Sequence, residues 1–297
     1  MRTHAIDRRA HGRTRFAGRL GEADRLSAAA LASFLDAERL GPNETVRGLN
    51  SLADAGPDDL AFSVHEDPAP VRESDAGVVV GSPALGPLPD RAVVYVARPK
   101  VAFARVAHEF FLEPLDETRI HPSAVVDGAA TVGERTRIGP QATLAAPVTV
   151  GDGCYVGANT AVGGVGFGFV ETDAGRHLRQ VHAGEVVIED EVAVGANCSI
   201  DRAVFDRTVV RRGAKLSGNV HLAHQVEIGE DATVAYGCGF AGGASVGAGA
   251  TIHPHASVAT DVTVGAGAEV GMHATVLDDV PPETTVVGSP ARPIDRS

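Results

Sequence analysis

Residues 210–240 read VRRGAKLSGNVHLAHQVEIGEDATVAYGCGF, and a large apolar side chain returns at every sixth position of this stretch. The returning residues are Val210, Leu216, Leu222, Ile228, Val234 and Phe240. A small or short side chain follows each of the first five after four residues: Ala214, Val220, Val226, Ala232 and Cys238. Self-similarity at a fixed short period is typical of a solenoid built from one strand and one turn per unit. The stretch therefore predicts stacked coils with both apolar positions pointing inward.

The six-residue period extends from this stretch toward both ends of the chain. Before it, the aliphatic positions are Ile120, Val126, Val132, Ile138, Leu144, Val150, Val156, Val162, Ile188, Val194 and Ile200. After it they are Val246, Ile252, Val258, Val264, Val270 and Val276. Three units close one triangular coil, and coils stack at about 4.8 Å, the spacing of paired strands. We therefore predict a mainly β fold, a parallel β-helix of hexapeptide repeats over 118–280, with a tail over 281–297. In known hexapeptide proteins this helix is left-handed, so we expect that hand here.

Two interruptions break the repeat. The first follows Val162 and runs through GGVGFGF, residues 163–169, to about Glu185; its centre is polar and holds His177 and His182. The second covers residues 201–208, where Ile200 and Val210 stand ten residues apart instead of six. Insertions in a solenoid commonly lie on its functional face, although a neutral loop would give the same pattern. We therefore expect a site near these breaks.

The chain before the repeats has a different pattern. Residues 1–25 are rich in Arg and lack an apolar core segment, so they predict a flexible basic extension and not a secretory signal. Residues 26–117 alternate helical and strand-like runs, with Ser27 as the expected N-cap of the first helix. This alternation predicts a small α/β domain.

Composition excludes several classes of protein. Among the 297 residues, the formal net charge of −12 argues against nucleic acid as a partner. No apolar run is long enough to span a membrane. The three cysteines, Cys154, Cys198 and Cys238, fall on the small inward position, where they are expected to fill the core rather than pair. We therefore expect a cytoplasmic protein.

Three motifs at the interruptions carry a resemblance. They are GVGFGF at 164–169, Ser199-Ile200-Asp201-Arg202, and HLAHQVEIG at 221–229. In this order the motifs are similar to those of the UDP-3-O-acylglucosamine N-acyltransferase family of lipid A synthesis. Residues 48–52 and 60–64 also resemble the uridine-binding domain of that family. The likeness covers about residues 26–280.

The resemblance implies a homotrimer, with sites in clefts between neighbouring prisms. It implies transfer of an acyl chain from acyl carrier protein to the amino group of a UDP-linked sugar, with no bound cofactor and no metal. The catalytic histidine of the family corresponds to His224, and a neutral imidazole suits a general base that deprotonates the amine. Gly242 stands one coil beyond His224, where it would let the thioester approach. Further residues expected at the substrate are Phe62, His65, Phe167, Phe169, Asp201, Arg202, His221 and Asp261.

Several positions depart from the family pattern. Val165 replaces an acid, Asp261 aligns with a second histidine, and His65 and Pro68 replace an Asn and a Tyr near the uracil. The C-terminal helices that engage acyl carrier protein are replaced by Val280-Pro281-Pro282 and Gly288-Ser289-Pro290. That ending resembles hexapeptide acetyltransferases that use acyl-CoA. The acyl donor is therefore open, and the basic cluster Arg211, Arg212 and Lys215 is a candidate for phosphates of CoA or for an acidic carrier protein.

Three functions remain to be compared. N-acyl transfer to an amino sugar or a related amine agrees best with the N-terminal domain. A CoA-dependent O- or N-acetyltransferase for another small acceptor agrees best with the C-terminus. A zinc enzyme of the γ-carbonic anhydrase type, or a scaffold, is the third, but His221/His224 and His253/His255 lack the spacing of a three-histidine zinc site.

Overall fold

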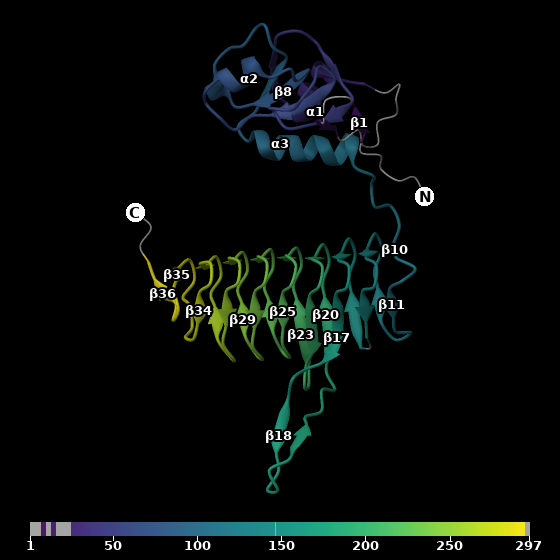
Figure 1. The fold of residues 1–297 in the computed structure, drawn as a ribbon, viewed down its shortest axis with the longest axis vertical. Coiled ribbons are helices and arrows are strands. Elements are labelled where there is room, and N and C mark those ends of the chain that lie inside the picture. Colours follow the sequence, from purple (N-terminus) through teal and green to yellow (C-terminus); the bar gives the residue numbers. More distant parts are fainter. Residues whose placement is uncertain (1–6, 10–12, 16–24, 146, 295–297) are drawn as a thin grey trace. The chain divides into compact units, whose positions relative to one another are not determined.

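The computed structural model describes residues 7–9, 13–15, 25–145 and 147–294. The chain divides into two compact units, Met1–Pro114 and Leu115–Ser297, which are described separately (Figure 1). Most of the predicted basic extension, residues 1–25, lies outside the described residues. Within it, β1 (Asp7–Arg9) and β2 (Arg13–Arg15) pair antiparallel. No helix in the described part of the chain is both long and apolar enough to cross a membrane.

The first unit is a five-stranded sheet with helices. The strand order is β4 (Glu38–Leu40), β9 (Val93–Tyr95), β8 (Val78–Gly81), β7 (Asp59–Phe62) and β6 (Gly48–Leu49). All neighbours are parallel except β4 and β9. A separate antiparallel pair joins β3 (Leu26–Ser27) to β5 (Thr45–Val46). The helices are α1 (Ala28–Leu35), α2 (Ala69–Glu73) and α3 (Pro99–Val106), with a 3₁₀ turn at Pro83–Leu85 and a π-helical turn at Ala107–Phe111.

Local sequence explains where the helices of this unit begin. The Ser27 hydroxyl accepts a hydrogen bond from the Ala30 N–H, which confirms the predicted N-cap of α1. Pro99 occupies the first turn of α3, where the missing N–H has no helical partner to lose. The apolar run at 45–49 forms two short strands, and these two strands, β5 and β6, belong to different sheets.

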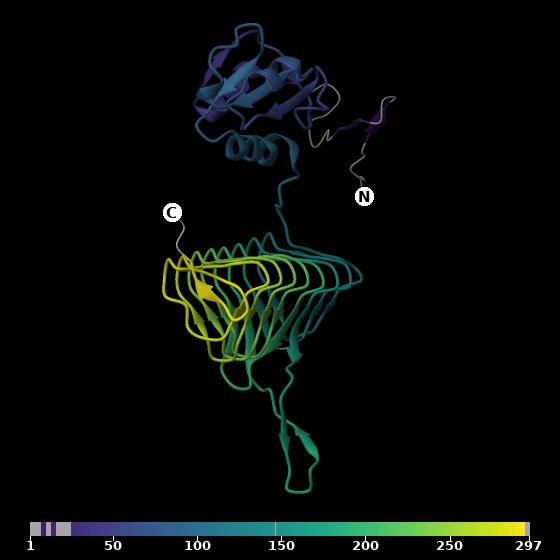
Figure 2. The same cartoon turned by 60° about the vertical axis from the view of Figure 1, so that its left-hand side comes forward.

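The second unit is the predicted parallel β-helix, with three flat faces (Figures 1 and 2). The first face holds β10 (Arg119–Ile120), β13 (Arg137–Ile138), β16 (Tyr155–Val156), β21 (Ala193–Val194), β24 (Lys215–Leu216), β27 (Thr233–Val234), β30 (Thr251–Ile252), β33 (Glu269–Val270), β35 (Thr285–Val287) and β36 (Arg292–Pro293). The second face holds β11 (Val125–Val126), β14 (Thr143–Leu144), β17 (Ala161–Val165), β22 (Ser199–Arg202), β25 (His221–Leu222), β28 (Gly239–Phe240), β31 (Ser257–Val258) and β34 (Thr275–Val276). The third face holds β12 (Thr131–Val132), β15 (Val148–Val150), β20 (Glu185–Ile188), β23 (Arg207–Val210), β26 (Glu227–Ile228), β29 (Ser245–Val246) and β32 (Thr263–Val264).

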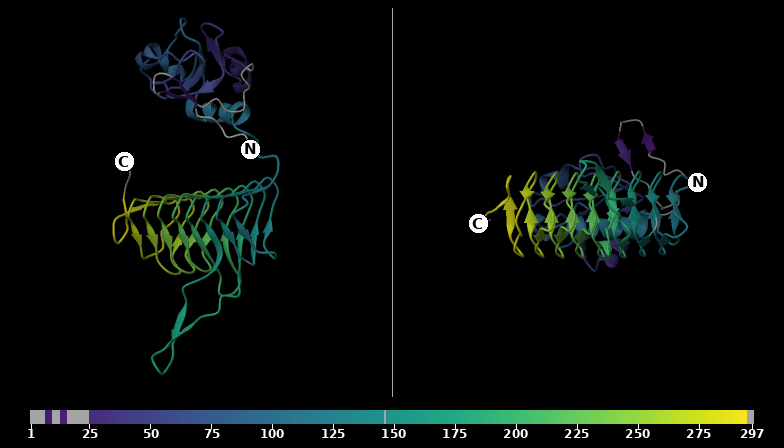
Figure 3. Two further views of the ribbon diagram at one scale, coloured as in Figure 1. Left: turned by 45° about the vertical axis from the view of Figure 1, so that its right-hand side comes forward. Right: turned by 90° about the horizontal axis from the view of Figure 1, so that it is seen from below.

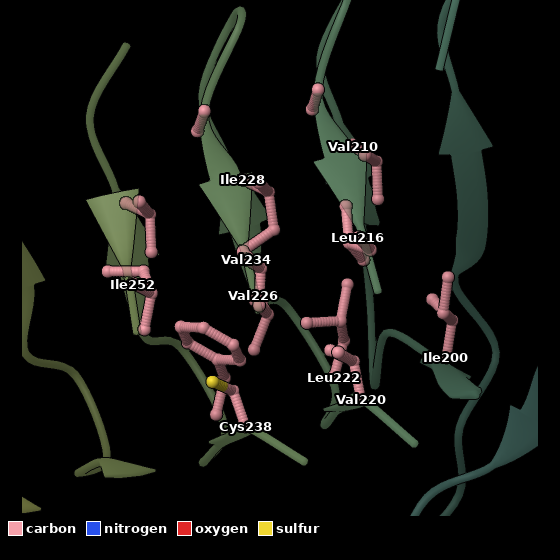
Figure 4. Packing of buried hydrophobic residues seen from close by; sticks show 14 of the residues in the cluster. Ile200, Val210, Leu216, Val220, Leu222, Val226, Ile228, Val234, Cys238 and Ile252 are labelled. Carbon is pink, nitrogen blue, oxygen red and sulfur yellow. The ribbon is translucent and has the colours of Figure 1, made fainter. Parts of the chain in front are cut away.

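The core of the prism is the column of aliphatic side chains that the period predicts. Every predicted aliphatic position from Ile138 to Val276 is buried, and Figure 4 shows Leu222, Ile228 and Val234 pointing into the same interior. Burying one such side chain stabilises the fold by about 1.5–3 kcal/mol. The first coil differs from the prediction, since Ile120 is 45% exposed. Its strand β10 is the first of its face, so no earlier coil of the described prism covers this side chain.

The corners of the coils require particular backbone conformations, and these explain which residues occur in the turns. Many turns contain one residue with positive φ, and Asn159, Asn197 and Asn219 take this conformation at equivalent positions of successive coils. Asn tolerates the left-handed region better than most residues. The predicted tail adds β35, which is parallel to β33, and β36, which folds back antiparallel on β35. Coil-to-coil hydrogen bonds therefore continue almost to the end of the described chain.

Candidate active site

Both interruptions of the repeat occur at one corner of the prism. The first connects β17 on the second face to β20 on the third, and the second connects β22 to β23 on the same two faces. We call this edge the insertion corner. The longer insertion leaves the prism as a hairpin of β18 (Phe169–Glu171) and β19 (His177–Arg179), seen projecting from the coils in Figures 1 and 3. His224 and Gly242 lie in later turns of the same corner, which concentrates the predicted residues along one edge.

The ring of His224 is held by Gln225 and by the close approach of Gly242. Its Nδ1 lies 3.0 Å from Oε1 of Gln225, and because an amide oxygen only accepts, Nδ1 carries the hydrogen and Nε2 the lone pair. The Gln225 N–H donates to Thr208 Oγ1 at 2.8 Å, which anchors this turn to the second insertion. The ring lies directly over Gly242, where an added Cβ would be 2.3 Å from the His224 Cε1 atom. Gly242 is therefore required for this ring position, as the coil count predicts.

A groove of about 480 Å³ runs beside this histidine. It begins at Phe167, Asp201 and His221 and continues over the next two coils. The later lining residues are mostly small: Ala223, Gly239, Ala241, Gly242, Ser257 and Thr260. Small side chains on successive coils leave an open channel along the prism, with the Nε2 side of His224 available to a bound molecule. The geometry suits an extended ligand lying across several coils.

Asp201 and His221 form the polar end of the groove. His221 Nε2 is 4.0 Å from Asp201 Oδ2, and His221 Nδ1 is 2.7 Å from Ser199 Oγ. Burial raises the pKa of the Asp201 carboxyl, while His221, His182 and His224 act in the opposite direction. The negative charge of the Asp201 carboxylate therefore favours a hydrogen-bond donor or a cation in this part of the groove.

Sequence reasoning missed one residue of this cluster, His182. It is buried, and its ring centroid lies 5.5 Å from that of His224 with an interplanar angle of 62°. The chain brings it there on the return from the hairpin, just before β20 resumes the repeat. Its position within an unusually polar insertion was the available signal, but a broken period cannot tell which polar residue turns inward.

The remaining predicted residues of the prism lie at different distances from this groove. Phe167 lines it and is 88% exposed, and its ring packs against Phe169 at 5.2 Å. Arg202 is half-buried on β22 and does not line the groove. Asp261 is exposed and lies over Gly243, one coil beyond Gly242, and it does not line the groove either. The structure therefore brings His224, Gly242, Asp201, His221 and Phe167 together.

The basic cluster lies elsewhere on the prism. Arg211 and Arg212 follow β23 in the turn from the third face to the first, and Lys215 lies on the first face. Arg211 pairs with Glu189 and Glu227 at 2.9 and 2.7 Å, and Arg212 pairs with Glu230. The Lys215 amine donates to the Glu191 carbonyl. These cations already have acidic or carbonyl partners, and an incoming phosphate would have to displace them.

The two predicted residues of the first unit occupy separate surroundings. The half-buried Phe62 ring packs on Phe103, with centroids 4.8 Å apart. His65 lines a pocket of about 420 Å³ with Leu52, Ala53, Pro70, Glu73 and Ser74. Phe62 is not among the residues that line this pocket. In the part of the chain that the structure describes, no group of three or more His, Cys, Asp or Glu side chains is arranged to hold a metal ion.

Comparison with known proteins supports the hexapeptide repeat and shows the family of the chain. Residues 129–164 match the family model "Bacterial transferase hexapeptide (six repeats)". A UDP-3-O-acylglucosamine N-acyltransferase of Methylacidiphilum infernorum is 37% identical over 292 residues, covering 86% of this chain and 83% of the relative. One of Syntrophobacter fumaroxidans is 38% identical over 240 residues, covering 68% of this chain and 67% of the relative.

A solved structure supports the fold alone. The UDP-N-acetylglucosamine acyltransferase of Campylobacter jejuni superposes with a TM-score of 0.51 at 20% identity, covering 59% of this chain and 74% of that one. The family itself follows from the longer sequence matches. The repeats, the insertion-corner motifs and these relatives together show that the chain belongs to the UDP-3-O-acylglucosamine N-acyltransferase family.

Proposed function

We propose that the protein transfers an acyl group from a thioester to the amino group of a UDP-linked amino sugar, with His224 as the general base. The observation that carries this proposal is the arrangement of His224. Its Nδ1 is tied to Gln225, its lone pair is on Nε2, and its ring lies over Gly242 beside an open groove. The names of the relatives supply the acceptor class, an acylated UDP-glucosamine.

The chemistry follows from this arrangement. The amine attacks the thioester carbonyl, and His224 Nε2 takes one amine proton as the C–N bond forms. When the C–S bond breaks, the same proton passes to the departing sulfur, so His224 returns to its neutral state. The tetrahedral oxyanion needs a hydrogen-bond donor. The Gly242 N–H is suited to this role, because it lies beside the imidazole and makes no backbone hydrogen bond within the described chain.

The acyl donor is proposed as acyl carrier protein or acyl-CoA. The groove accommodates an extended thioester arm, since Gly239, Gly242 and Ser257 leave its floor low. Binding of the donor through Arg211, Arg212 and Lys215 stays a prediction, as does assembly into a homotrimer. For the UDP portion, the pocket at His65 is the proposed position in the first unit.

Thiol release tests the proposed reaction. Wild type and His224→Ala are compared with acyl-carrier-protein and acyl-CoA donors, with and without UDP-3-O-acylglucosamine. We expect release that depends on the acceptor in wild type, and a loss of at least about 100-fold in the variant. His121→Ala on the exposed first coil is the control, because among the described residues the His121 side chain hydrogen-bonds with its neighbour Ser123 and with no residue of the groove. Equal rates for wild type and His224→Ala would remove His224 from the mechanism.

A CoA-dependent acetyltransferase is the second candidate. The observation that favours it is the segment after the last repeat, where β35 extends the first face and β36 folds back on β35. The two candidates predict different donors in the same assay. Turnover with acetyl-CoA and a small acceptor, without turnover of a long-chain acyl carrier protein, would favour the second.

A further inference from the structure

The two kinds of acceptor that an acyltransferase can use, hydroxyls and amines, differ in the number of their hydrogens. An attacking hydroxyl has one hydrogen, which the base removes. An amine has two and its ammonium form three, so at least one N–H remains after His224 has taken a proton. A buried N–H without a partner costs about 1–3 kcal/mol. A site that acylates amines therefore needs an acceptor beside the base.

Asp201 is that kind of acceptor. It lines the groove with His224, and its side chain is only 14% exposed. An ionised carboxylate can only accept hydrogen bonds. Among the residues that the structure describes, none donates a hydrogen bond to this carboxylate, and His221 Nε2 stands off at 4.0 Å. The Asp201 carboxylate is therefore largely shielded from solvent, and its oxygens can still accept hydrogen bonds from a ligand.

A second acceptor lies behind Asp201. His182 is 4% exposed, and its Nδ1 lies 3.1 Å from the Gln180 carbonyl oxygen, so Nδ1 is the donor and Nε2 bears the lone pair. That Nε2 atom is buried and has no hydrogen-bond partner among the described residues. An added Cβ on Gly166 would lie 2.6 Å from His182 Nε2 and 3.5 Å from Asp201 Oδ2. The two acceptor atoms thus lie close to the same side of Gly166, and no described residue donates a hydrogen bond to either of them.

The carboxylate of Asp201 and the Nε2 lone pair of His182 indicate which kind of ligand group would bind here. Two accepting groups beside each other favour a hydrogen-bond donor, above all a cationic one. A hydroxyl acceptor whose only hydrogen has gone to His224 would leave the carboxylate unpaired. Sites built to hydrogen-bond one substrate group discriminate strongly against the analogue that lacks it. An amine can donate one N–H to His224 and a second to Asp201, whereas a hydroxyl can donate to only one of them.

We propose that Asp201, backed by His182, selects an amine over a hydroxyl by accepting the N–H that His224 does not remove. This inference rests on the proposed function, because it deepens the role of the same groove. It assigns Asp201 direct contact with the acceptor nitrogen and His182 a supporting position behind it. Neither role requires a change in the prism.

A binding experiment separates this inference from the acyl transfer itself. The wild-type protein, without an acyl donor, is titrated by calorimetry with UDP-3-O-acylglucosamine and with the matching UDP-3-O-acylglucose, which has a hydroxyl in place of the amine. We expect tighter binding of the amine. Asp201→Asn should weaken binding of the amine by about 10- to 100-fold and of the hydroxyl analogue by less than about twofold. His182→Phe, which keeps a ring but removes Nε2, should reduce the preference in the same direction by a smaller factor.

Matched controls come from the same insertions. Asp206→Asn removes an exposed carboxylate that pairs with Arg207, and His177→Phe changes an exposed histidine of the hairpin. Neither should alter the preference. Equal weakening of both ligands by Asp201→Asn, or no weakening, would overturn the inference, as would a failure to bind either ligand. Selective amine binding by a wild-type protein that transfers no acyl group would instead refute the proposed function and leave the role of Asp201 intact.

Discussion

Gly242→Ala should disable the enzyme without unfolding it. The new Cβ would lie 2.3 Å from His224 Cε1, 2.6 Å from Nε2 and 2.9 Å from Nδ1. Carbon atoms in contact normally stand about 3.5–4.0 Å apart, so the imidazole must move by about 1 Å or more. A misplacement of that size can lower a rate by about 100-fold, which corresponds to about 2.7 kcal/mol in the activation free energy. Gly242 does not have positive φ, so alanine fits its backbone.

The assay measures kcat for thiol release together with the melting temperature. Gly128→Ala is the matched control, because Gly128 stands at the equivalent repeat position of an earlier coil and an added Cβ there meets nothing within 4 Å. We expect Gly128→Ala to keep full activity and Gly242→Ala to lose about two orders of magnitude at an unchanged melting temperature. Full activity in Gly242→Ala would refute the placement of the His224 ring. A large fall in melting temperature would show that the loss is structural.

Three further predictions concern stability and reactivity. Burial raises the pKa of Asp201 in the folded state, so its ionisation opposes folding at pH values above its unfolded pKa of about 3.9. Asp201→Asn should therefore raise the melting temperature at neutral pH, and this gain should vanish below about pH 3.9. An equal gain at all pH values would contradict burial as the cause. Burial also raises the pKa of the thiols of Cys154, Cys198 and Cys238. An aromatic disulfide reagent should therefore react with no thiol in the native protein and with three after denaturation. Fast labelling of the native protein would place a cysteine outside the core. Ile228→Ala should cost about 2–5 kcal/mol in urea unfolding and the exposed Val125→Ala less than about 0.5 kcal/mol; similar losses would contradict the predicted inward register.

The repeat made much of the prism predictable, because its period assigns each side chain a direction. Leu222 and Ile228 had to be inside for the coils to close, and both are buried. Counting coils also placed Gly242 next to His224. Such reasoning uses only spacing, so it works wherever the spacing is regular. It failed at Ile120, since a period shows where a side chain points but not whether another coil covers it.

The site was less predictable than the prism for the same reason. Once the period breaks after Val162, nothing in the sequence indicates how the hairpin returns. His182 was therefore not recognised, although its ring lies against that of His224. The partners of Arg211 and Arg212 could not be predicted either. Glu189, Glu227 and Glu230 are distant in sequence and pair with these arginines only in three dimensions, while the phosphate site at the two arginines stays a prediction.

The insertion corner also bears on how such a protein can acquire new specificity. The repeat positions on either side of the hairpin stay aligned, with Val162 opposite Ile200 and Val150 opposite Ile188. The register of β17 against β22 shifts only after Val162, where the long excursion begins. The cost of a longer loop grows only slowly with its length. A segment at this edge can thus be lengthened, shortened or exchanged while the stacked coils retain their hydrogen bonds. The prism and the recognition loops can change independently, which makes the corner a natural place to graft loops for new acceptors.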